Sequence, residues 1–187
     1  MGRRGFGAGT LPAGVDSNHA PGLAAARSVP ARRGVVLDAY EIRNVYGAQV
    51  MASIRNECRA GFSNDTGSIS YAEQAAWYAR NRAGIIARLY EFGRNNPVGY
   101  GLLRRDDAGR LVSSVAVLPD WGGRGIGAAI TADIIRATRE RVYATARLDN
   151  PAAVALHRAE DWIRTGDDGR LAHFVTRPEI ADEYNGG

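Results

Sequence analysis

A glycine-rich turn in the second half of the chain has the composition of an anion-binding loop. Gly123, Gly125 and Gly127 alternate with other residues in the run GGRGIG, directly before a helical pattern that begins at Ile126. Without side chains at these positions, successive backbone N–H groups can approach an anion closely at the positive end of a helix. The turn therefore predicts a site for a pyrophosphate group, to which Arg124 can add a charge-assisted contact.

Cys58 is the only cysteine in the chain. A lone cysteine cannot form an intrachain disulfide or build a cysteine metal site, so we predict no metal centre. Val50, Ile54 and Cys58 are spaced to line one face of a helix that continues to about Arg59. This spacing favours packing in the core over a role as a covalent nucleophile.

The glycine-rich turn needs a strand before it and a helix after it. The run LVSSVAVL, residues 111 to 118, is strongly β-prone and leads into the turn. After the turn we predict a helix that ends at about Arg141. Its apolar stripe consists of Ile126, Ile130, Ile134 and Ala137.

The remaining predicted elements are a strand and two helices before a three-stranded antiparallel meander, and further strands and a helix after the glycine-rich turn. We expect a strand at 35 to 42, the helix that carries Cys58, a second helix that starts from a capping box of Ser70 and Glu73, and strands at 85 to 92 and 98 to 104. Later in the chain we expect a strand at 142 to 148, a helix at 151 to 160 and a strand at 171 to 176. This order predicts a mixed α/β domain.

The length of 187 residues and the hydrophobic content of 45% suit one packed domain. Residues 1 to 33 are rich in Gly, Ala, Pro and Arg without apolar periodicity, so we expect a disordered or loosely attached segment followed by one domain over residues 34 to 187. No run approaches the roughly 18 apolar residues of a membrane span, and no signal core is present at the N-terminus. We therefore expect a cytoplasmic protein with no membrane partner.

All 24 basic residues are Arg, and the formal net charge is +4. Arg carries a fixed charge and a planar set of donors that suit anionic ligands. The Arg residues are scattered, without a sustained basic run or interleaved aromatic residues, so the pattern does not indicate a dedicated nucleic-acid-binding face. An anionic small ligand is equally consistent with some of them.

The segment VAVLPDWGGRGIGAAI, residues 115 to 130, resembles the GNAT acetyltransferases. The strand end from Val117 to Pro119 matches the family motif, as do Gly125 and Gly127. Gly122 departs from the motif, because the family has Arg or Gln there. The resemblance implies the GNAT fold, in which helices flank a central, mostly antiparallel sheet, and N-acetyltransferase activity with acetyl-CoA.

The resemblance also implies where acetyl-CoA binds. The backbone of one strand would receive the pantetheine arm and the acetyl carbonyl, through Val115, Ala116 and Val117. The loop after it would wrap the pyrophosphate, through Gly122, Gly123, Arg124, Gly125, Ile126, Gly127 and Ala128.

A second segment, RLDNPAAVALHRAEDW at residues 147 to 162, resembles the family at the expected place downstream. Asn150 can cap the helix that follows, with Pro151 in its first turn. In the family this Asn commonly contacts the pantetheine arm, and both roles can coexist. His157 stands where the family usually has Tyr.

The resemblance suggests two candidate catalytic residues. Tyr in the family often protonates the departing CoA thiolate, so His157 is a candidate general acid or part of a proton relay, and otherwise a cofactor-edge histidine. Many relatives have a Glu base on the fourth strand, where this chain has Ser113 and Ser114. Deprotonation of the acceptor amine would then pass through water or through Asp149.

Residues 54 to 81 resemble the acceptor segment of amino-sugar N-acetyltransferases. Aromatic side chains can stack on a sugar or a base, and Arg55 or Arg80 can meet a nucleotide phosphate. The alternative is that the aromatic residues belong to the core. The matching positions are Arg55, Asn56, Phe62, Ser70, Trp77 and Tyr78.

The acceptor remains open among several classes. We expect the primary amine of a small molecule, such as an amino sugar or a nucleotide-linked amino sugar. The alternatives are a macromolecular amine, on a protein N-terminus, an aminoacyl-tRNA or a modified base, and a CoA-binding sensor without turnover. Analogy with the family also suggests a homodimer.

Overall fold

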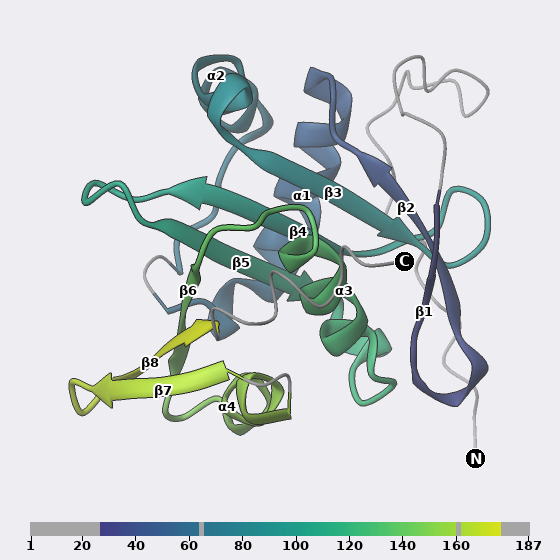
Figure 1. Cartoon of the computed structure of the whole chain (residues 1–187). Coiled ribbons are helices and arrows are strands. Elements are labelled where there is room, and N and C mark those ends of the chain that lie inside the picture. Colours follow the sequence, from purple (N-terminus) through teal and green to yellow (C-terminus); the bar gives the residue numbers. More distant parts are fainter. Residues whose placement is uncertain (1–26, 64–65, 160–161, 177–187) are drawn as a thin grey trace.

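The computed structural model describes residues 27–63, 66–159 and 162–176 (Figure 1). In these residues an eight-stranded sheet has the order β1-β2-β3-β4-β5-β6-β8-β7. No helix in the described ranges is long and apolar enough to cross a membrane. The elements are β1 (Arg27–Pro30), β2 (Val36–Glu41), α1 (Val45–Cys58), α2 (Tyr71–Asn81), β3 (Ile86–Glu91), β4 (Pro97–Arg105), β5 (Leu111–Val117), α3 (Ile126–Ile135), β6 (Val142–Arg147), α4 (Pro151–Ala159), β7 (Trp162–Asp167) and β8 (Leu171–Thr176).

The predicted mixed α/β class is confirmed, and so is the capping box that starts α2. The Ser70 hydroxyl accepts from the Glu73 backbone N–H at 3.2 Å, while the Glu73 carboxylate accepts from the Ser70 N–H at 2.8 Å. Paired strands are antiparallel except β5 and β6, which run parallel. Most of the sheet is therefore antiparallel, as the family resemblance implies.

Two strands were not predicted. β1 lies within the segment expected to be loosely attached, but it pairs with β2 and buries Val29, so that expectation is wrong for residues 27 to 33. Residues 1–26 lie outside the described ranges. β7 is an edge strand that is exposed after Trp162, so its sequence has no apolar alternation to reveal it.

Helix α3 is shorter than predicted. It ends at Ile135 instead of Arg141, and the Ala137 and Thr138 N–H groups donate to carbonyls three residues back. The run RATRER consists mostly of good helix formers, which explains the prediction. The chain must turn there because Val142 begins β6 in the buried centre of the sheet.

Helices cover both faces of the sheet (Figure 1), with α3 in front of the central strands and α1 behind them. Along β4, Tyr100 and Leu102 face the cluster built by α1 and α2. Gly99 and Gly101 alternate with them and face Ile130 and Ile134 of α3. Because neither glycine has a side chain, α3 lies close to the backbone of β4.

Gly99→Ala is expected to destabilise the protein by about 1–3 kcal/mol. A Cβ at this position would lie 2.5 Å from the Ala116 carbonyl oxygen and 2.8 Å from Ile130 Cδ1, and the carbonyl cannot move without shifting β5. Denaturant unfolding would measure the loss. Gly84→Ala is the control, because a Cβ there meets no heavy atom within 4 Å. Equal stability of the two variants would contradict the close packing of α3.

The parallel strands β5 and β6 separate soon after they meet. In the described residues they pair only at Leu111 with Val142 and at Val112 with Tyr143. Beyond Val112 none of the described strands pairs with this edge of β5, so backbone groups from Ser113 to Val117 face an opening. This divergence positions the candidate site.

Candidate functional site

A cavity of about 930 Å³ occupies the opening between β5 and β6. This volume suits a ligand of substantial size. Its walls come from the C-terminal half of α1, the loop after α1, the start of α2, strands β4, β5 and β6, and helix α4. The cavity therefore joins the acceptor segment of the sequence to the segments that resemble a CoA site.

The edge of β5 forms one wall, and Val115, Ala116 and Val117 all line it. An unpaired strand edge offers N–H and C=O groups that an extended ligand with amide groups can pair with, as an added strand would. The Val117 carbonyl accepts a hydrogen bond from the Cys58 thiol at 3.2 Å, which ties α1 to the end of β5. The predicted backbone site thus lies on the cavity.

The glycine-rich loop adjoins this strand and ends in helix α3. Gly123 and Gly125 have φ of 72° and 76°, in the left-handed region that favours glycine. Gly125 is the N-cap of α3, so the cap residue has no side chain to accept a hydrogen bond from the first turn. The N–H groups of that turn, at the positive end of the helix, are therefore available to an anion. Ile126 is only 1% exposed, so it can contribute through its backbone alone.

Arg124 is partly engaged elsewhere. Its guanidinium carbon lies 4.7 Å from the centre of the Trp121 ring, and Nη2 donates to the Asp120 carbonyl at 3.4 Å. The contact with Trp121 is a cation–π interaction. The side chain therefore lies against its own loop.

Asn150 fulfils the predicted capping role and also lines the cavity. Its Oδ1 accepts from the Ala153 N–H at 3.2 Å, at the start of α4, and its Nδ2 donates to the Gly61 carbonyl at 3.4 Å. The second contact crosses to the loop after α1. The amide is thus held at the boundary between the two halves of the site.

The loop from Ala60 to Ser63 is fastened across the opening by other polar contacts. Arg147 Nη1 donates to the Ala60 carbonyl at 3.1 Å, and Arg170 Nη2 donates to the Ser63 carbonyl at 2.9 Å. The Ser63 and Thr145 hydroxyls are 2.9 Å apart. These contacts join the first half of the chain to β6 and β8, so the cavity has a wall on this side as well.

His157 lies in α4 and lines the cavity, although it is only 8% exposed. Its ring stacks on Phe174, with centroids 4.8 Å apart, and meets Trp162 edge-on at 4.9 Å. Nδ1 is 2.8 Å from the Ala153 carbonyl, which can only accept, so Nδ1 carries the proton. Burial lowers the pKa of His157, and the hydrogen bond to Ala153 opposes this in part. The neutral ring therefore has a lone pair at Nε2, and acting as a general acid would require a protonated ring that burial disfavours.

His157→Phe is expected to reduce the pH dependence of stability. In the unfolded chain His157 titrates near its usual pKa of about 6.5, whereas the folded pKa is lower. As the pH falls through about 6.5, the unfolded state binds a proton at His157 more readily than the folded state does. The free energy of unfolding of the wild type therefore falls as the pH is lowered from about 7 to 5. Unfolding curves across this range would measure the difference between the two proteins. If the free energy of unfolding of the two proteins changed with pH in the same way, a lowered pKa of His157 would be contradicted.

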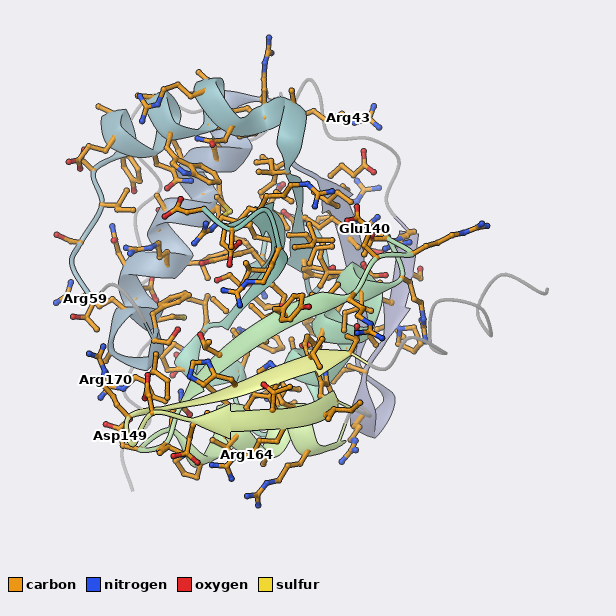
Figure 2. The ribbon with its side chains drawn as sticks, turned by 60° about the vertical axis from the view of Figure 1, so that its left-hand side comes forward. Arg43, Arg59, Glu140, Asp149, Arg164 and Arg170 are labelled. Carbon is orange, nitrogen blue, oxygen red and sulfur yellow. The ribbon has the colours of Figure 1, made fainter. Side chains whose placement is uncertain are left out.

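Asp149 does not line the cavity, contrary to its prediction as a base. It lies at the edge of the molecule beside Arg170 (Figure 2) and forms a two-pronged ion pair with Arg147. The hydrogen bond and charge of Arg147 lower the pKa of Asp149, which makes its carboxylate a weaker base. Adjacency in sequence to Asn150 suggested the role, but the turn after β6 directs Asp149 outward.

Cys58 lines the cavity but has the properties predicted for a packed residue. Burial, and to a lesser degree the charge of Glu57, raises the pKa of its thiol to about 11. The thiol also donates to the Val117 carbonyl. A thiolate nucleophile at neutral pH is therefore disfavoured.

The structure divides the predicted acceptor residues into two groups. Arg55, Phe62 and Trp77 line the cavity, and the Arg55 guanidinium carbon lies 5.6 Å from the centre of the Phe62 ring. Asn56 and Tyr78 do not line it. Asn56 bonds the N–H and C=O of Ile69 at 2.8 Å, and the buried Tyr78 hydroxyl donates to the Ile42 carbonyl at 3.1 Å, so both positions stabilise the fold.

The sequence prediction missed Glu57 and Arg104, which also line the cavity. Among the described residues of its wall, Glu57 is the only carboxylate. Glu57 follows Ile54 by three positions and Val50 by seven, which places it at the edge of the predicted apolar stripe. A charged residue at the edge of an apolar helix face was the sequence pattern that could have identified Glu57 as a site residue.

Known proteins resemble this chain in sequence and in fold. The sequence profile described as the Acetyltransferase (GNAT) family matches residues 51–160, whereas a search of curated proteins gave no match.

Solved structures share the fold at low identity. A phosphinothricin acetyltransferase from Sinorhizobium meliloti in complex with acetyl-CoA is 19% identical, with a TM-score of 0.64 over 74% of this chain and 86% of that one. Mutant forms of the spermidine/spermine N-acetyltransferase from Vibrio cholerae are 12% identical, with a TM-score of 0.62 over 78% and 95%. A ribosomal L7/L12 α-N-protein acetyltransferase in complex with coenzyme A is 13% identical, with a TM-score of 0.62 over 82% and 99%.

Proposed function

Because this chain belongs to the acetyltransferase (GNAT) family, we propose that it transfers the acetyl group of acetyl-CoA to a primary amine of a small molecule. The observation that carries the proposal is the cavity itself, which reaches from the unpaired edge of β5 to the side chains of α1 and α2. The end of the cavity at β5 suits a cofactor with amide groups, and the end at α1 and α2 suits an acceptor.

The residues present fit acetyl-CoA. The pantetheine arm has amide groups that can pair with the edge of β5 from Val115 to Val117. The first turn of α3 and the loop from Gly122 to Gly127 leave N–H groups available to the pyrophosphate. Asn150 lies between these elements and α1, where its amide can exchange the long contact with Gly61 for one with the arm.

Glu57 is our candidate for the base. Acetyl-CoA supplies the acetyl group as a thioester, whose carbonyl carbon accepts the amine and whose thiolate leaves. A primary amine is mostly protonated near neutral pH, so it must lose a proton before it can attack. Glu57 is the one carboxylate among the described residues of the cavity wall, and it can hold the ammonium group and take its proton. It replaces Asp149 in this role.

We place amino sugars, free or linked to a nucleotide, first among the acceptors. The support is the pair of aromatic side chains in the wall, Phe62 and Trp77, whose faces can stack on a sugar ring. Arg55 and Arg104 line the same cavity and can pair with a phosphate of a nucleotide-linked sugar. A polyamine carries no anionic group for Arg55 or Arg104 to pair with.

The test is release of free CoA from acetyl-CoA by the purified protein in the presence of different acceptors. The panel contains amino sugars, nucleotide-linked amino sugars, polyamines, peptides and aminoacyl-tRNA, and Glu57→Gln controls for contaminating activity. Turnover on an amino sugar is the expected result. Turnover only on peptides or aminoacyl-tRNA would replace the small-molecule acceptor with a macromolecular one. Binding of acetyl-CoA without turnover on any acceptor would favour a sensor.

A further inference from the structure

The turn between β1 and β2 lies against the glycine-rich loop. Figure 1 shows this turn and the start of α3 at the same end of the molecule. A Cβ on Gly125 would lie 2.8, 2.7 and 3.1 Å from the Cβ, Cγ and Cδ atoms of Arg32. Arg32 therefore extends its aliphatic stem across the N-cap of α3, at a position where only glycine leaves room for it.

The contact is between elements that pack on each other. Val29 and Leu37, on either side of the turn, are 5% and 0% exposed and pack in one cluster with Ile126 and Ile130 of α3. Within the turn, the Ala31 N–H donates to the Val35 carbonyl at 2.7 Å. The hairpin thus holds the backbone of Arg32 in a fixed position relative to the first turn of α3.

The loop itself carries one cation, Arg124, and that side chain is engaged with its own loop. Gly122 stands where the family motif has a side chain that can donate hydrogen bonds, and Arg124 lies against Trp121. Arg32 is exposed, and no described carboxylate forms an ion pair with it. The stem of Arg32 therefore brings a side chain that has no described carboxylate partner to the end of α3 whose N–H groups already favour an anion.

We propose that Arg32 binds the pyrophosphate of CoA, so that the β1–β2 hairpin forms part of the cofactor site and supplies the charge that Gly122 lacks. This inference rests on the proposed use of acetyl-CoA. A guanidinium matches the geometry of phosphate oxygens and can make two parallel hydrogen bonds. The family model matches residues 51–160. A segment that lies before this range would then contribute directly to cofactor affinity.

Titration calorimetry with CoA at low ionic strength tests the proposal. Arg32→Ala is expected to weaken binding about tenfold, Arg32→Lys to weaken it less, and the deficit to shrink at high salt. The matched control is Arg43→Ala, which removes the same charge beyond the other end of β2, where the exposed Arg43 pairs with the partly buried Glu41. Thermal unfolding shows whether each variant is folded.

Three further ligands separate the possible outcomes. Acetyl-pantetheine, which lacks the pyrophosphate, should bind Arg32→Ala and the wild type equally well. Dephospho-CoA, which lacks only the 3′-phosphate, should show the same deficit as CoA, and a deficit that disappears would overturn the assignment to the pyrophosphate. Equal CoA affinity of Arg32→Ala and the wild type would refute the role of Arg32 alone. Failure of the wild type to bind acetyl-CoA would refute both this inference and the proposed function.

Discussion

Glu57→Gln is expected to lower kcat about a hundredfold at neutral pH, with CoA affinity changed less than about twofold. The carboxylate is the one acidic group among the described residues of the cavity wall, whereas Gln has the same shape and cannot take a proton. Steady-state kinetics on the best acceptor would measure kcat and KM, and calorimetry would measure CoA affinity. The deficit should therefore appear in turnover and not in cofactor binding.

The pH profile distinguishes a base from a structural residue. As the pH rises towards the pKa of the amine, typically about 10, more of the acceptor is already neutral and needs no base, so the deficit of Glu57→Gln should shrink. Glu140→Gln removes an exposed carboxylate paired with Arg105 and is expected to leave kcat unchanged. A deficit that is constant with pH, or equal in both variants, would exclude Glu57 as the base.

Asp133→Asn is expected to destabilise the protein by about 3–5 kcal/mol. Asp133 lies in α3, is 4% exposed, and accepts from Arg88 Nη1 at 3.0 Å and from the Tyr90 hydroxyl at 2.7 Å. Arg27 of β1 also pairs with it. Without the carboxylate, the buried Arg88 guanidinium loses its described ion-pair partner. Tm should fall on the order of 10 °C in a thermal unfolding experiment.

Two controls show whether burial causes this loss. Glu140→Gln breaks an ion pair whose side chains are 52% and 55% exposed, and its cost should be below about 1 kcal/mol. Adding Arg88→Met to Asp133→Asn should cost little more, because the uncompensated cation is removed with it. If the two single carboxylate variants lose the same stability, the cluster of Asp133, Arg88 and Tyr90 does not anchor α3.

This cluster connects stability to the cofactor site. Asp133 holds α3 against β1 and β3, while Gly99 and Gly101 let the helix approach β4. The first turn of α3 presents the N–H groups to the anion, so its direction depends on these contacts. Substitutions that loosen α3 should weaken CoA binding as well as lower the free energy of unfolding.

The sequence by itself determined the features that depend on neighbouring residues. The glycine spacing from Gly123 to Gly127, the capping box of Ser70 and Glu73, and the apolar stripe that contains Cys58 are local patterns, and each lies where it was predicted. Each of these patterns arises from interactions between residues a few positions apart in the sequence, so they can be recognised without knowledge of the tertiary structure. The motif at the glycine-rich turn also indicated the family.

Only the tertiary structure decided which side chains share the cavity. Asp149 and Asn150 are adjacent, yet the turn after β6 directs one outward and the other towards the loop after α1. Glu57 lines the cavity where β5 and β6 diverge, and Arg32 lies against the N-cap of α3 because a hairpin packs on that helix. Both placements depend on contacts between residues far apart in the chain. Burial and packing among distant elements, which no local pattern records, determine these positions.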